Sequence, residues 1–383
     1  MGGMAEQTSQ AGAQTQQNQQ NQADAYDDEL IATFERWTPI DDDLDAAVAA
    51  GCPRELAEGI KANRYQGAMF DLSRTAYWHD PEGIDVISDI AYLPDGEPDA
   101  GDVRSHRLDL YIPHEAFVRG GKTTPVYIDI HGGGFLYGAK ELNRNFNTHL
   151  AAEGFAVFSL NYTLAPGAPL TGQLADIQAA LKWIKAHMSE YPVDPASVFI
   201  TGDSAGAALS LYTLAIENSP AAAAAFGIEE ASGIGFKGGA LISGVFDLSA
   251  PSAAGAAGAA GNSLNPEEYF NSRLRLGESL GDRFFAGLEA ADPAFLTPEG
   301  ITANVPLPPL FLNTSSDDFI QHETLALAAA LARKGADFEV HDWKTAPGQT
   351  LGHVFPVAMT WLEESQRVLA DIRRFTYARL RAA

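Results

Sequence analysis

The sequence predicts an α/β fold in which helices flank both faces of a mostly parallel central sheet. Six short apolar runs have the composition of strands that are buried on both faces. The segments between them show helical periodicity, and strands that alternate with helices form a parallel sheet between two helical layers. The chain has 383 residues, of which 46% are hydrophobic, so a large core can form. The six runs are PVYIDIH, FAVFSLNY, SVFITG, GGALISG, PPLFLNT and DFEVHDW.

The part of the chain before these runs divides into three segments. Residues 1–28 are mostly Gln, Asn, Ala, Ser and Gly, so they bury too little apolar surface to fold, and we expect a disordered tail. Residues 29–80 have helical character and include Asp41–Asp43, whose charges suit a helix N-terminus. The segments IDVISDIAYL and RSHRLDLYI then predict a first antiparallel strand pair, because Pro and Gly separate them.

The alternation of strands and helices is interrupted once. Residues 248–305 begin with SAPSAAGAAGAAGNS, which is flexible by composition, and continue with a segment of helical character. This insertion divides the predicted core into residues 81–247 and 306–383. Together with the helices of residues 29–80, it is expected to form a helical cap, and it is the candidate for a lid.

Charge and cysteine content narrow the class of protein. The 25 Lys and Arg residues against 50 Asp and Glu residues give a formal net charge of −25, which argues against nucleic acids and anionic membranes as partners. Cys52 is the single cysteine, so no intramolecular disulfide can form, and we expect it to be a small buried residue. Neither a bilayer-spanning apolar run nor the basic-then-apolar order of a secretory signal is present, so we expect a cytoplasmic location.

The stretch FITGDSAGAAL contains the strongest chemical signal. Gly202, Ser204 and Gly206 form the pattern G-x-S-x-G between an apolar run and an amphipathic helix. A serine on such a tight turn has a strained backbone and an exposed hydroxyl, and side chains in place of the glycines would collide with strand and helix. The helix directs its N-terminal amides towards negative charge beside the serine. We interpret Ser204 as a nucleophile; the alternative is a serine that only caps the helix.

A nucleophilic serine needs a histidine to remove its proton and a carboxylate to orient that histidine, and here both are expected to follow the serine in the chain. Beyond Ser204 the histidines are His322, His341 and His353. His341 lies in a predicted strand, where a structural role is expected, and His322 is too close in sequence to the acidic loop. His353 lies in a loop between the last strand and the final helix, so it is the predicted base.

The acidic loop offers two candidates for the carboxylate. The stretch PPLFLNTSSDDFIQHE ends a predicted strand with Asp317 and Asp318, of which only one need contact the histidine. Asp318 is preferred because Phe319 and Ile320, which follow it, look like apolar residues that anchor such a loop. The other carboxylate would be solvated in the loop or would cap a helix, and Asp317 remains the alternative acid.

A second motif, His131–Gly134, reads HGGG and follows an apolar run. With Gly202–Gly206, which reads GDSAG, it makes the chain resemble the hormone-sensitive-lipase-like family of α/β-hydrolases over roughly residues 126–357. The segments SDDFIQHE and GHVF are similar to the acid and base segments of that family. NYTLAP is similar to its YRLAPE segment, with Thr163 in place of the arginine and Gly167 in place of the glutamate.

The resemblance implies an oxyanion hole formed by the backbone amides of Gly133, Gly134 and Ala205. A tetrahedral intermediate carries a negative oxygen, which such donors stabilise in a dry pocket. A merely flexible glycine turn is the alternative, but the bulky residues that follow at once argue against it. The loop is expected to be supported by the remaining motif residues, which are His131, Gly132 and Asp203.

We therefore predict an α/β-hydrolase fold with a helical cap, which acts as a serine carboxylesterase on short- to medium-chain acyl esters. Ser204 would attack the carbonyl, His353 would move the proton and Asp318 would hold the imidazole, so that an acyl-enzyme forms. An amidase or formamidase would use the same triad, and a non-catalytic small-molecule receptor on this fold is a third hypothesis. No metal or organic cofactor is implied. An exposed edge strand near the C-terminal end of the sheet would permit a homodimer.

Overall fold

The structure, a computed structural model, describes residues 26–248, 276–288 and 291–382. The predicted tail up to residue 25 and the low-complexity start of the insertion lie outside the described residues. The first helix, α2, begins at Asp28, one residue before the predicted start of the helical segment, and Asp27 caps it by accepting hydrogen bonds from two of its amides.

An eight-stranded sheet with the order β1-β2-β4-β3-β5-β6-β7-β8 forms the centre of the molecule. β1 pairs with β2 and β2 with β4 in the antiparallel sense, whereas every other neighbouring pair is parallel. This confirms the predicted mostly parallel sheet and its first antiparallel pair. The strands are β1 Ile84–Ala91, β2 Arg107–Pro113, β3 Thr124–Ile130, β4 Ala156–Leu160, β5 Val193–Asp203, β6 Gly238–Ile242, β7 Leu310–Ser315 and β8 Phe338–Trp343.

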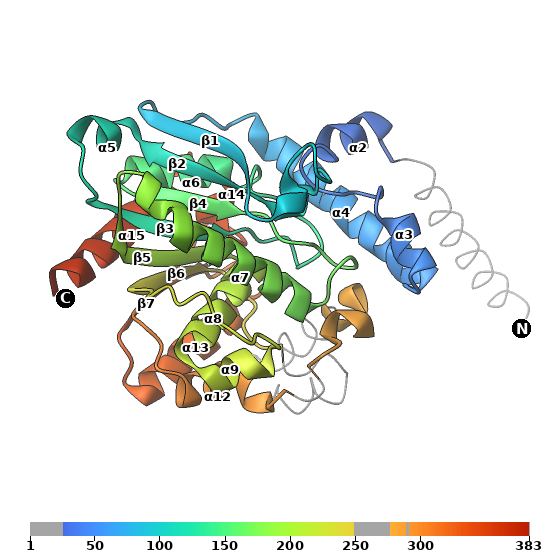
Figure 1. Ribbon diagram of the computed structural model, residues 1–383. Helices are drawn as coiled ribbons and strands as arrows, with labels where there is room; N and C mark the ends of the chain where they lie inside the picture. The colour runs from blue at the N-terminus through green and yellow to red at the C-terminus, as the bar shows by residue number, and fades with distance from the viewer. Residues whose placement is uncertain (1–25, 249–275, 289–290, 383) are drawn as a thin grey trace, which may run out of the picture.

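Both faces of the sheet are covered by helices, as Figure 1 shows. Side chains alternate between the faces along each strand, so β3 sends Val126, Ile128 and Ile130 into one core and Tyr127 into the other. The first core lies against α7, α8 and α13, and the second against α6, α14 and α15. These helices are α6 Arg144–Ala152, α7 Leu170–His187, α8 Ala205–Asn218, α13 Gln321–Lys334, α14 Phe355–Ala358 and α15 Glu363–Ala382. Shorter helices are α5 His114–Arg119, α9 Pro220–Ala225 and α12 Pro298–Asn304, of which α12 lies in the predicted insertion.

Within the described residues, three helices precede the sheet: α2 Asp28–Phe34, α3 Leu44–Ala49 and α4 Arg54–Thr75. Cys52, in the turn between α3 and α4, is buried as predicted. Asp43 occupies the N-cap position of α3, but its carboxylate makes no hydrogen bond to that helix. The carboxylate binds the guanidinium of Arg64 on α4 instead. Asp43 therefore lies at a helix N-terminus, as expected, but its side chain connects two helices and does not cap α3.

The described part of the insertion contacts both the N-terminal helices and the core. Its 3₁₀ turn, Asp282–Phe285, places Phe284 against the ring of Phe135, with the ring centroids 5.2 Å apart. Arg283 donates a hydrogen bond to the carbonyl oxygen of Ala50 at 3.0 Å. Because the insertion meets the N-terminal helices and the core at once, we propose that the two predicted cap segments form one cap.

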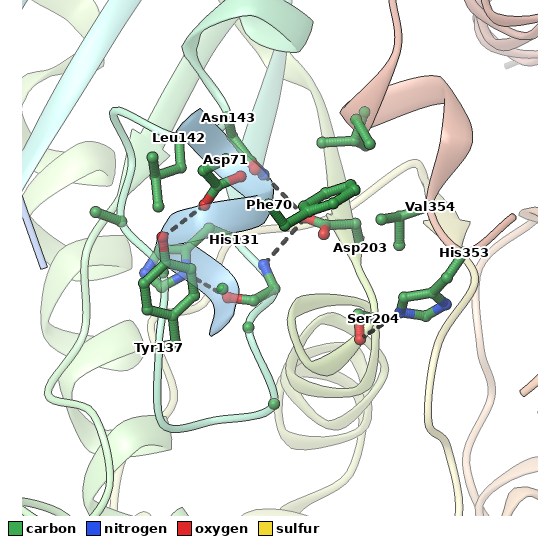
Figure 2. A pocket seen from close by; sticks show the side chains of 18 of the residues that line it. Phe70, Asp71, His131, Tyr137, Leu142, Asn143, Asp203, Ser204, His353 and Val354 are labelled. Atoms are coloured by element: carbon green, nitrogen blue, oxygen red, sulfur yellow. Dashed lines mark hydrogen bonds between the residues drawn. The ribbon is translucent and has the colours of Figure 1, made fainter. Parts of the chain in front are cut away.

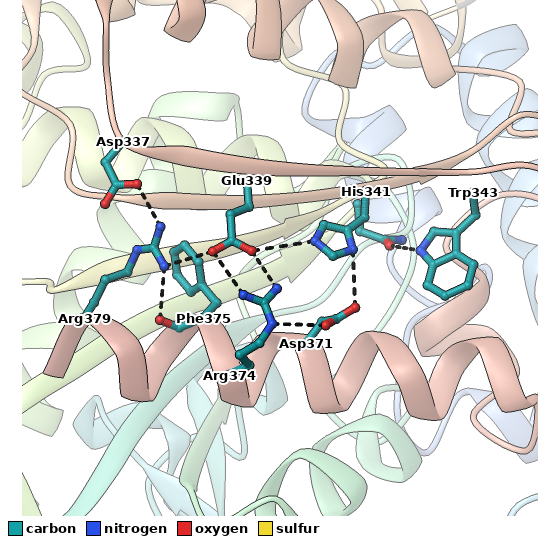
Figure 3. A network of polar contacts seen from close by, with 9 residues as sticks. Asp337, Glu339, His341, Trp343, Asp371, Arg374, Phe375 and Arg379 are labelled. Atoms are coloured by element: carbon teal, nitrogen blue, oxygen red, sulfur yellow. Dashed lines mark hydrogen bonds and ion pairs between the residues drawn. The ribbon is translucent and has the colours of Figure 1, made fainter. Parts of the chain in front are cut away.

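β8 is an edge strand, and α15 is attached to it by a network of ion pairs (Figure 3). Glu339 binds Arg374 at 2.7 Å and Arg379 at 3.1 Å, and Arg379 also binds Asp337 at 2.7 Å. Partial burial opposes ionisation of Glu339, but the hydrogen bonds from the two arginines outweigh it and lower the pKa of that carboxyl. The network fixes the last helix on the sheet; a homodimer across this edge remains a prediction.

Candidate active site

Ser204 lies on the tight turn that joins β5 to α8. Its backbone has φ +53° and ψ −119°, a strained conformation for a residue with a side chain, and the prediction of strain is confirmed. A Cβ atom at Gly206 would collide with the carbonyl oxygen of Ile130, and one at Gly202 would lie 2.7 Å from the same oxygen. The two glycines are therefore required for the close approach of the turn to β3.

The structure brings together the three side chains that were predicted as a triad. Nε2 of His353 lies 2.9 Å from Oγ of Ser204, and Nδ1 of His353 lies 2.9 Å from Oδ1 of Asp318. Since an ionised carboxylate can only accept, Nδ1 carries the proton and Nε2 is free to accept the serine proton. Figure 2 shows Ser204 and His353 facing each other at the floor of a pocket.

Asp318 is buried and held in its ionised form. Its carboxylate accepts hydrogen bonds from the hydroxyl of Thr314 at 3.2 Å and from the backbone amide of Ile320 at 3.0 Å. Burial opposes ionisation, but the hydrogen bond and the charge of His353, followed by hydrogen bonds from the Ser243 side chain and the backbone amide of Ile320, outweigh it and lower the pKa of Asp318. The side chain is therefore a permanent acceptor that fixes the orientation of the imidazole.

Asp317, the alternative acid, does not contact the imidazole in the structure. It is exposed, and its carboxylate accepts hydrogen bonds from the backbone amides of Leu351 and Gly352 at 3.0 Å each and from the hydroxyl of Ser315 at 2.8 Å. Slight burial opposes ionisation, but these donors lower its pKa. Asp317 thus fastens the segment that leads into His353.

The two other late histidines lie away from the serine. His341 is on β8, as predicted, where its ring lies 3.3 Å from Asp371 and 3.7 Å from Glu339 (Figure 3). His322 is buried in the first turn of α13. Within the described residues, His353 is the histidine that contacts Ser204.

The glycine loop after β3 passes beside the serine. Gly133 has φ +110° and Gly134 has φ +62°, and among the described residues no hydrogen bond uses the backbone N–H of either. A Cβ atom at Gly133 would collide with the carbonyl of Tyr137, whereas one at Gly134 would meet nothing within 4 Å. The backbone conformation of Gly134 therefore favours glycine, and the space beside it is open.

His131 and Asp203 contact the glycine loop through hydrogen bonds. The Nδ1–H of His131 donates to the carbonyl oxygen of Gly132 at 2.7 Å, and its ring stacks on Tyr162 with centroids 4.4 Å apart. Burial lowers the pKa of His131 to about 4, so the ring stays neutral at physiological pH. Asp203 accepts the backbone N–H of Gly132 at 3.0 Å. All three residues that were predicted to support the loop therefore lie where they can do so.

A network of buried polar side chains extends from Asp203, and it was not predicted from the sequence. Nδ2 of Asn143 donates to Asp203 at 2.9 Å (Figure 2). The same nitrogen lies 3.3 Å from Asp129. Asp129 also accepts from Asn147 and Ser159 at 2.8 Å each. Burial is the main cause that raises the pKa of Asp129 to about 7, and burial likewise raises the pKa of Asp203. In the stretch YIDI, Tyr127 and Asp129 alternate with isoleucines. This alternation was the signal in the sequence that a polar group faces inwards.

A pocket of about 310 Å³ opens above the serine, and helix α4 forms one wall of it. Phe70 lies at the rim, and Asp71 accepts from the hydroxyl of Tyr137 at 2.6 Å and from Arg74 at 2.5 Å. Gly67 faces the ring of Tyr137, where a Cβ atom would lie 2.8 Å away. The role of α4 was missed, although its buried positions follow helical spacing: Ala57, Ile60, Arg64, Ala68, Asp71 and Arg74.

The part of the chain that the structure describes contains no group of three or more His, Cys, Asp or Glu side chains that could hold a metal ion. Among the same residues, every helix is too short or too polar to cross a bilayer.

Comparison with known proteins identifies the family of the chain. A profile of the alpha/beta hydrolase fold matches residues 127–353, which is more than half of the sequence and includes both motifs and the three residues predicted as a triad. The chain belongs to this family, which confirms the predicted resemblance and the fold class.

Curated relatives match over part of their length. A probable carboxylic ester hydrolase, LipM of Mycobacterium tuberculosis, is 34% identical over 131 residues, which are 34% of this chain and 30% of LipM. Esterase LipQ of the same organism is 28% identical over 163 residues, which are 42% of this chain and 36% of LipQ. The matched segments thus span about a third of these relatives.

Among solved structures, esterase B of Lactobacillus rhamnosis has a TM-score of 0.69 and 26% identity, with 88% of this chain and 96% of that chain covered. An esterase of Pyrobaculum calidifontis has a TM-score of 0.58 and 21% identity, with 83% and 93% covered, and this second likeness concerns the fold.

Proposed function

We propose that the protein is a serine carboxylesterase that hydrolyses short- to medium-chain acyl esters. The observation that carries the proposal is the hydrogen-bonded series Ser204–His353–Asp318, of which Ser204 and His353 line a pocket. The relatives named esterases and carboxylic ester hydrolases support the same reaction class. No metal or organic cofactor takes part in the proposed reaction.

The reaction begins at the serine hydroxyl. His353 accepts the proton of Ser204 at Nε2 while Oγ forms a bond to the ester carbonyl carbon, and Asp318 stabilises the imidazolium through Nδ1–H. The tetrahedral intermediate expels the alcohol, which takes the proton from Nε2. Water then attacks the acyl-enzyme and gives a proton to Nε2 of His353. The bond between Oγ and the acyl carbon breaks, the proton returns from Nε2 to Oγ of Ser204, and the carboxylic acid leaves.

The negative oxygen of each tetrahedral intermediate would lie between the glycine loop and the start of α8. Backbone amides of Gly133, Gly134 and Ala205 are the proposed donors, and the unpaired amides of the two glycines support this role. Donors that are held in place before the reaction stabilise the transition state without reorganisation, which is worth about a hundredfold to a thousandfold in rate for each.

Two observations support a preference for short and medium acyl chains. The pocket of about 310 Å³ is bounded by Phe70, Tyr137, Leu142 and Val357, so its surface suits an alkyl group of limited length. The neighbour esterase B, which is 26% identical, has been solved with a C4-C4 tributyrin phosphonate inhibitor. We therefore propose that butyryl and similar groups bind between α4 and the glycine loop.

A panel of p-nitrophenyl esters of rising acyl length tests the proposal. We expect the highest kcat/KM on short to medium chains, and we expect Ser204→Ala to remove almost all activity on every ester. Matched anilides, measured in parallel, test the predicted amidase alternative, because amide cleavage at a comparable rate would contradict an esterase. Full esterase activity in Ser204→Ala would contradict the catalytic role altogether and would favour the receptor hypothesis.

A further inference from the structure

Arg64 is fully buried in the middle of α4, and its guanidinium is surrounded by acceptors. A guanidinium has five N–H groups, and five acceptor atoms lie within hydrogen-bonding distance of it. Nε donates to the carbonyl oxygen of Leu136 at 2.7 Å, and Nη2 donates to that of Ala165 at 2.9 Å. The remaining contacts go to both carboxylate oxygens of Asp43, at 2.6 and 3.0 Å, and to the carbonyl of Ile40 at 3.4 Å.

These acceptors belong to three separate parts of the molecule. Leu136 is in the glycine loop, Ala165 is in the segment that follows β4, and Asp43 is in the cap before α3. No other donor is recorded for the carbonyl of Leu136 among the described residues. Arg64 therefore joins the cap to the loop that carries the proposed oxyanion donors.

The contacts around Leu136 and Ala165 reach the glycine loop through further hydrogen bonds. The amide of Ala165 donates to the carbonyl of Phe135 at 2.9 Å, and Gln173 donates to the same carbonyl at 2.8 Å. The amide of Leu136 in turn donates to the carbonyl of Gly133 at 3.2 Å. The carbonyl of Leu136 shares a peptide plane with the amide of Tyr137, which donates to the carbonyl of Gly133 at 2.9 Å. Holding the carbonyls of residues 135 and 136 therefore fixes the carbonyl of Gly133, and with it the direction of the N–H group of Gly134 in the same peptide plane.

A buried guanidinium suits this position better than any other side chain. Burying an unpaired charge is costly, so its persistence at this site requires the bidentate contact with Asp43 together with the carbonyl acceptors. Lysine has three donors on a flexible stem and cannot satisfy acceptors in this planar arrangement. Thr163, which replaces the arginine of the related family motif, leaves the segment that follows β4 without a cation of its own, and Arg64 supplies one at Ala165.

We propose that Arg64 is a positioning residue for the oxyanion loop, and that through it the N-terminal cap sets the rate of the chemical step. This inference rests on the proposed serine esterase function. Arg64 would not touch the substrate; it would act by holding the peptide between Gly133 and Gly134 so that the N–H of Gly134 points at the reacting oxygen. Its loss should therefore weaken binding of the transition state more than binding of the ester.

The test compares Arg64→Met and Arg64→Lys with the wild type on p-nitrophenyl butyrate. We expect kcat to fall about tenfold to a hundredfold, because a small displacement of catalytic groups costs that much, while KM changes less than about threefold. A reversible trifluoromethyl ketone inhibitor, whose addition to a serine creates an oxyanion, should bind more weakly by the same factor. The corresponding non-fluorinated ketone should bind unchanged.

Two control variants separate positioning from loss of stability. Ile60→Ala removes a fully buried side chain one turn earlier on α4, so it destabilises the same helix but leaves the hydrogen bonds of Arg64 to the loop in place. Arg54→Met removes an exposed charge at the start of α4. If Ile60→Ala lowers kcat and ketone affinity as much as Arg64→Met at temperatures where both are folded, the inference is wrong.

A milder variant covers the case in which Arg64→Met does not fold. Asp43→Asn keeps the arginine but removes the charge that orients it, and Asp43 is one-third exposed, so folding should survive. We expect a smaller fall in kcat with the same parallel loss of ketone affinity; unchanged values would overturn the inference. Ser204→Ala is measured beside it. If Ser204→Ala is inactive but the Arg64 and Asp43 variants keep their kcat, only this inference fails and the proposed function stands.

Discussion

Asp317 and Asp318 are consecutive in the chain, but their carboxylates bind different parts of one loop. Asp318 accepts from the imidazole of His353, whereas Asp317 accepts from the backbone amides of Leu351 and Gly352 just before it. The first carboxylate orients the proposed base, and the second fixes the backbone that carries the base. Substitution by asparagine is therefore expected to have different effects at the two positions.

Asp318→Asn should lower kcat about a thousandfold to ten-thousandfold, because the amide no longer stabilises the required tautomer or the imidazolium. Asp317→Asn should lower kcat by less than about tenfold, since its amide oxygen can still accept one of the backbone N–H groups. Steady-state rates on p-nitrophenyl butyrate measure both. Equal losses in the two variants would show that Asp318 has no special role.

The pocket wall formed by α4 predicts a change in acyl-chain preference. Gly67→Ala places a Cβ atom 2.8 Å from the ring of Tyr137, so that ring must move and the pocket must narrow. We expect the ratio of kcat/KM for octanoyl over acetyl esters to fall about tenfold. Gly59→Ala is the matched control, because an added Cβ atom there meets nothing within 4 Å. A similar shift in both variants would contradict the assigned pocket wall.

The buried carboxyl of Asp129 predicts how stability changes with pH. Burial raises its pKa to about 7 in the folded state, so folding favours the protonated form. Its contribution to stability is fully present below about pH 4, the usual pKa of an unfolded aspartate, and is lost as pH rises through about 7. Asp129→Asn should therefore remove part of the decline in the free energy of unfolding between about pH 4 and pH 7.

Urea unfolding at several pH values measures this effect. The comparison concerns slopes rather than absolute stabilities, because an amide also changes the contact with Asn143. The expected difference in slope amounts to a few kcal/mol over the whole interval. Parallel curves for the wild type and Asp129→Asn would show that Asp129 is already ionised in the folded protein at low pH.

The ion-pair network between β8 and α15 predicts a change in stability without a change in activity. Glu339→Gln should cost about 1 kcal/mol at neutral pH, because it leaves Arg374 and Arg379 without their shared carboxylate. The pKa of Glu339 is lowered, so this contribution is present above about pH 4.5 and is lost as pH falls further. Thermal unfolding at neutral and at acid pH measures it.

Glu363→Gln is the matched control for that network. Glu363 pairs with Arg367 one turn away on α15, and both side chains are more than half exposed, so little stability should depend on the pair. An equal effect of Glu339→Gln and Glu363→Gln would contradict the assigned role of the network.

The sequence predicted much of the sheet and of the candidate triad, because both depend on local patterns. Ser204 sits in a five-residue motif whose geometry is set by strand, turn and helix, and His353 follows from chain order after that motif. Asp317 and Asp318 could not be separated with certainty, since adjacent residues in a loop differ only in the direction of their side chains. That direction is set by Leu351 and Gly352, more than thirty residues further on.

The contribution of α4 could not be predicted for a related reason. Arg64 finds its partners between 21 and 101 residues away, and such contacts leave no mark on the local sequence. Charged residues at helical spacing with Ile60 and Ala68 are normally assigned to a solvated face. In this protein they lie on the buried face, where Arg64, Asp71 and Arg74 bind carbonyl groups and side chains of the core.

The central claim is that Ser204 carries the acyl group during ester hydrolysis, and trapping that intermediate tests it most directly. The wild type is mixed with p-nitrophenyl butyrate, quenched with acid within the first turnover and analysed by intact mass and peptide mapping. We predict one butyryl group per chain, on the peptide that contains Ser204, and none in Ser204→Ala. A butyryl group on another residue, or hydrolysis at the wild-type rate by Ser204→Ala, would contradict the account.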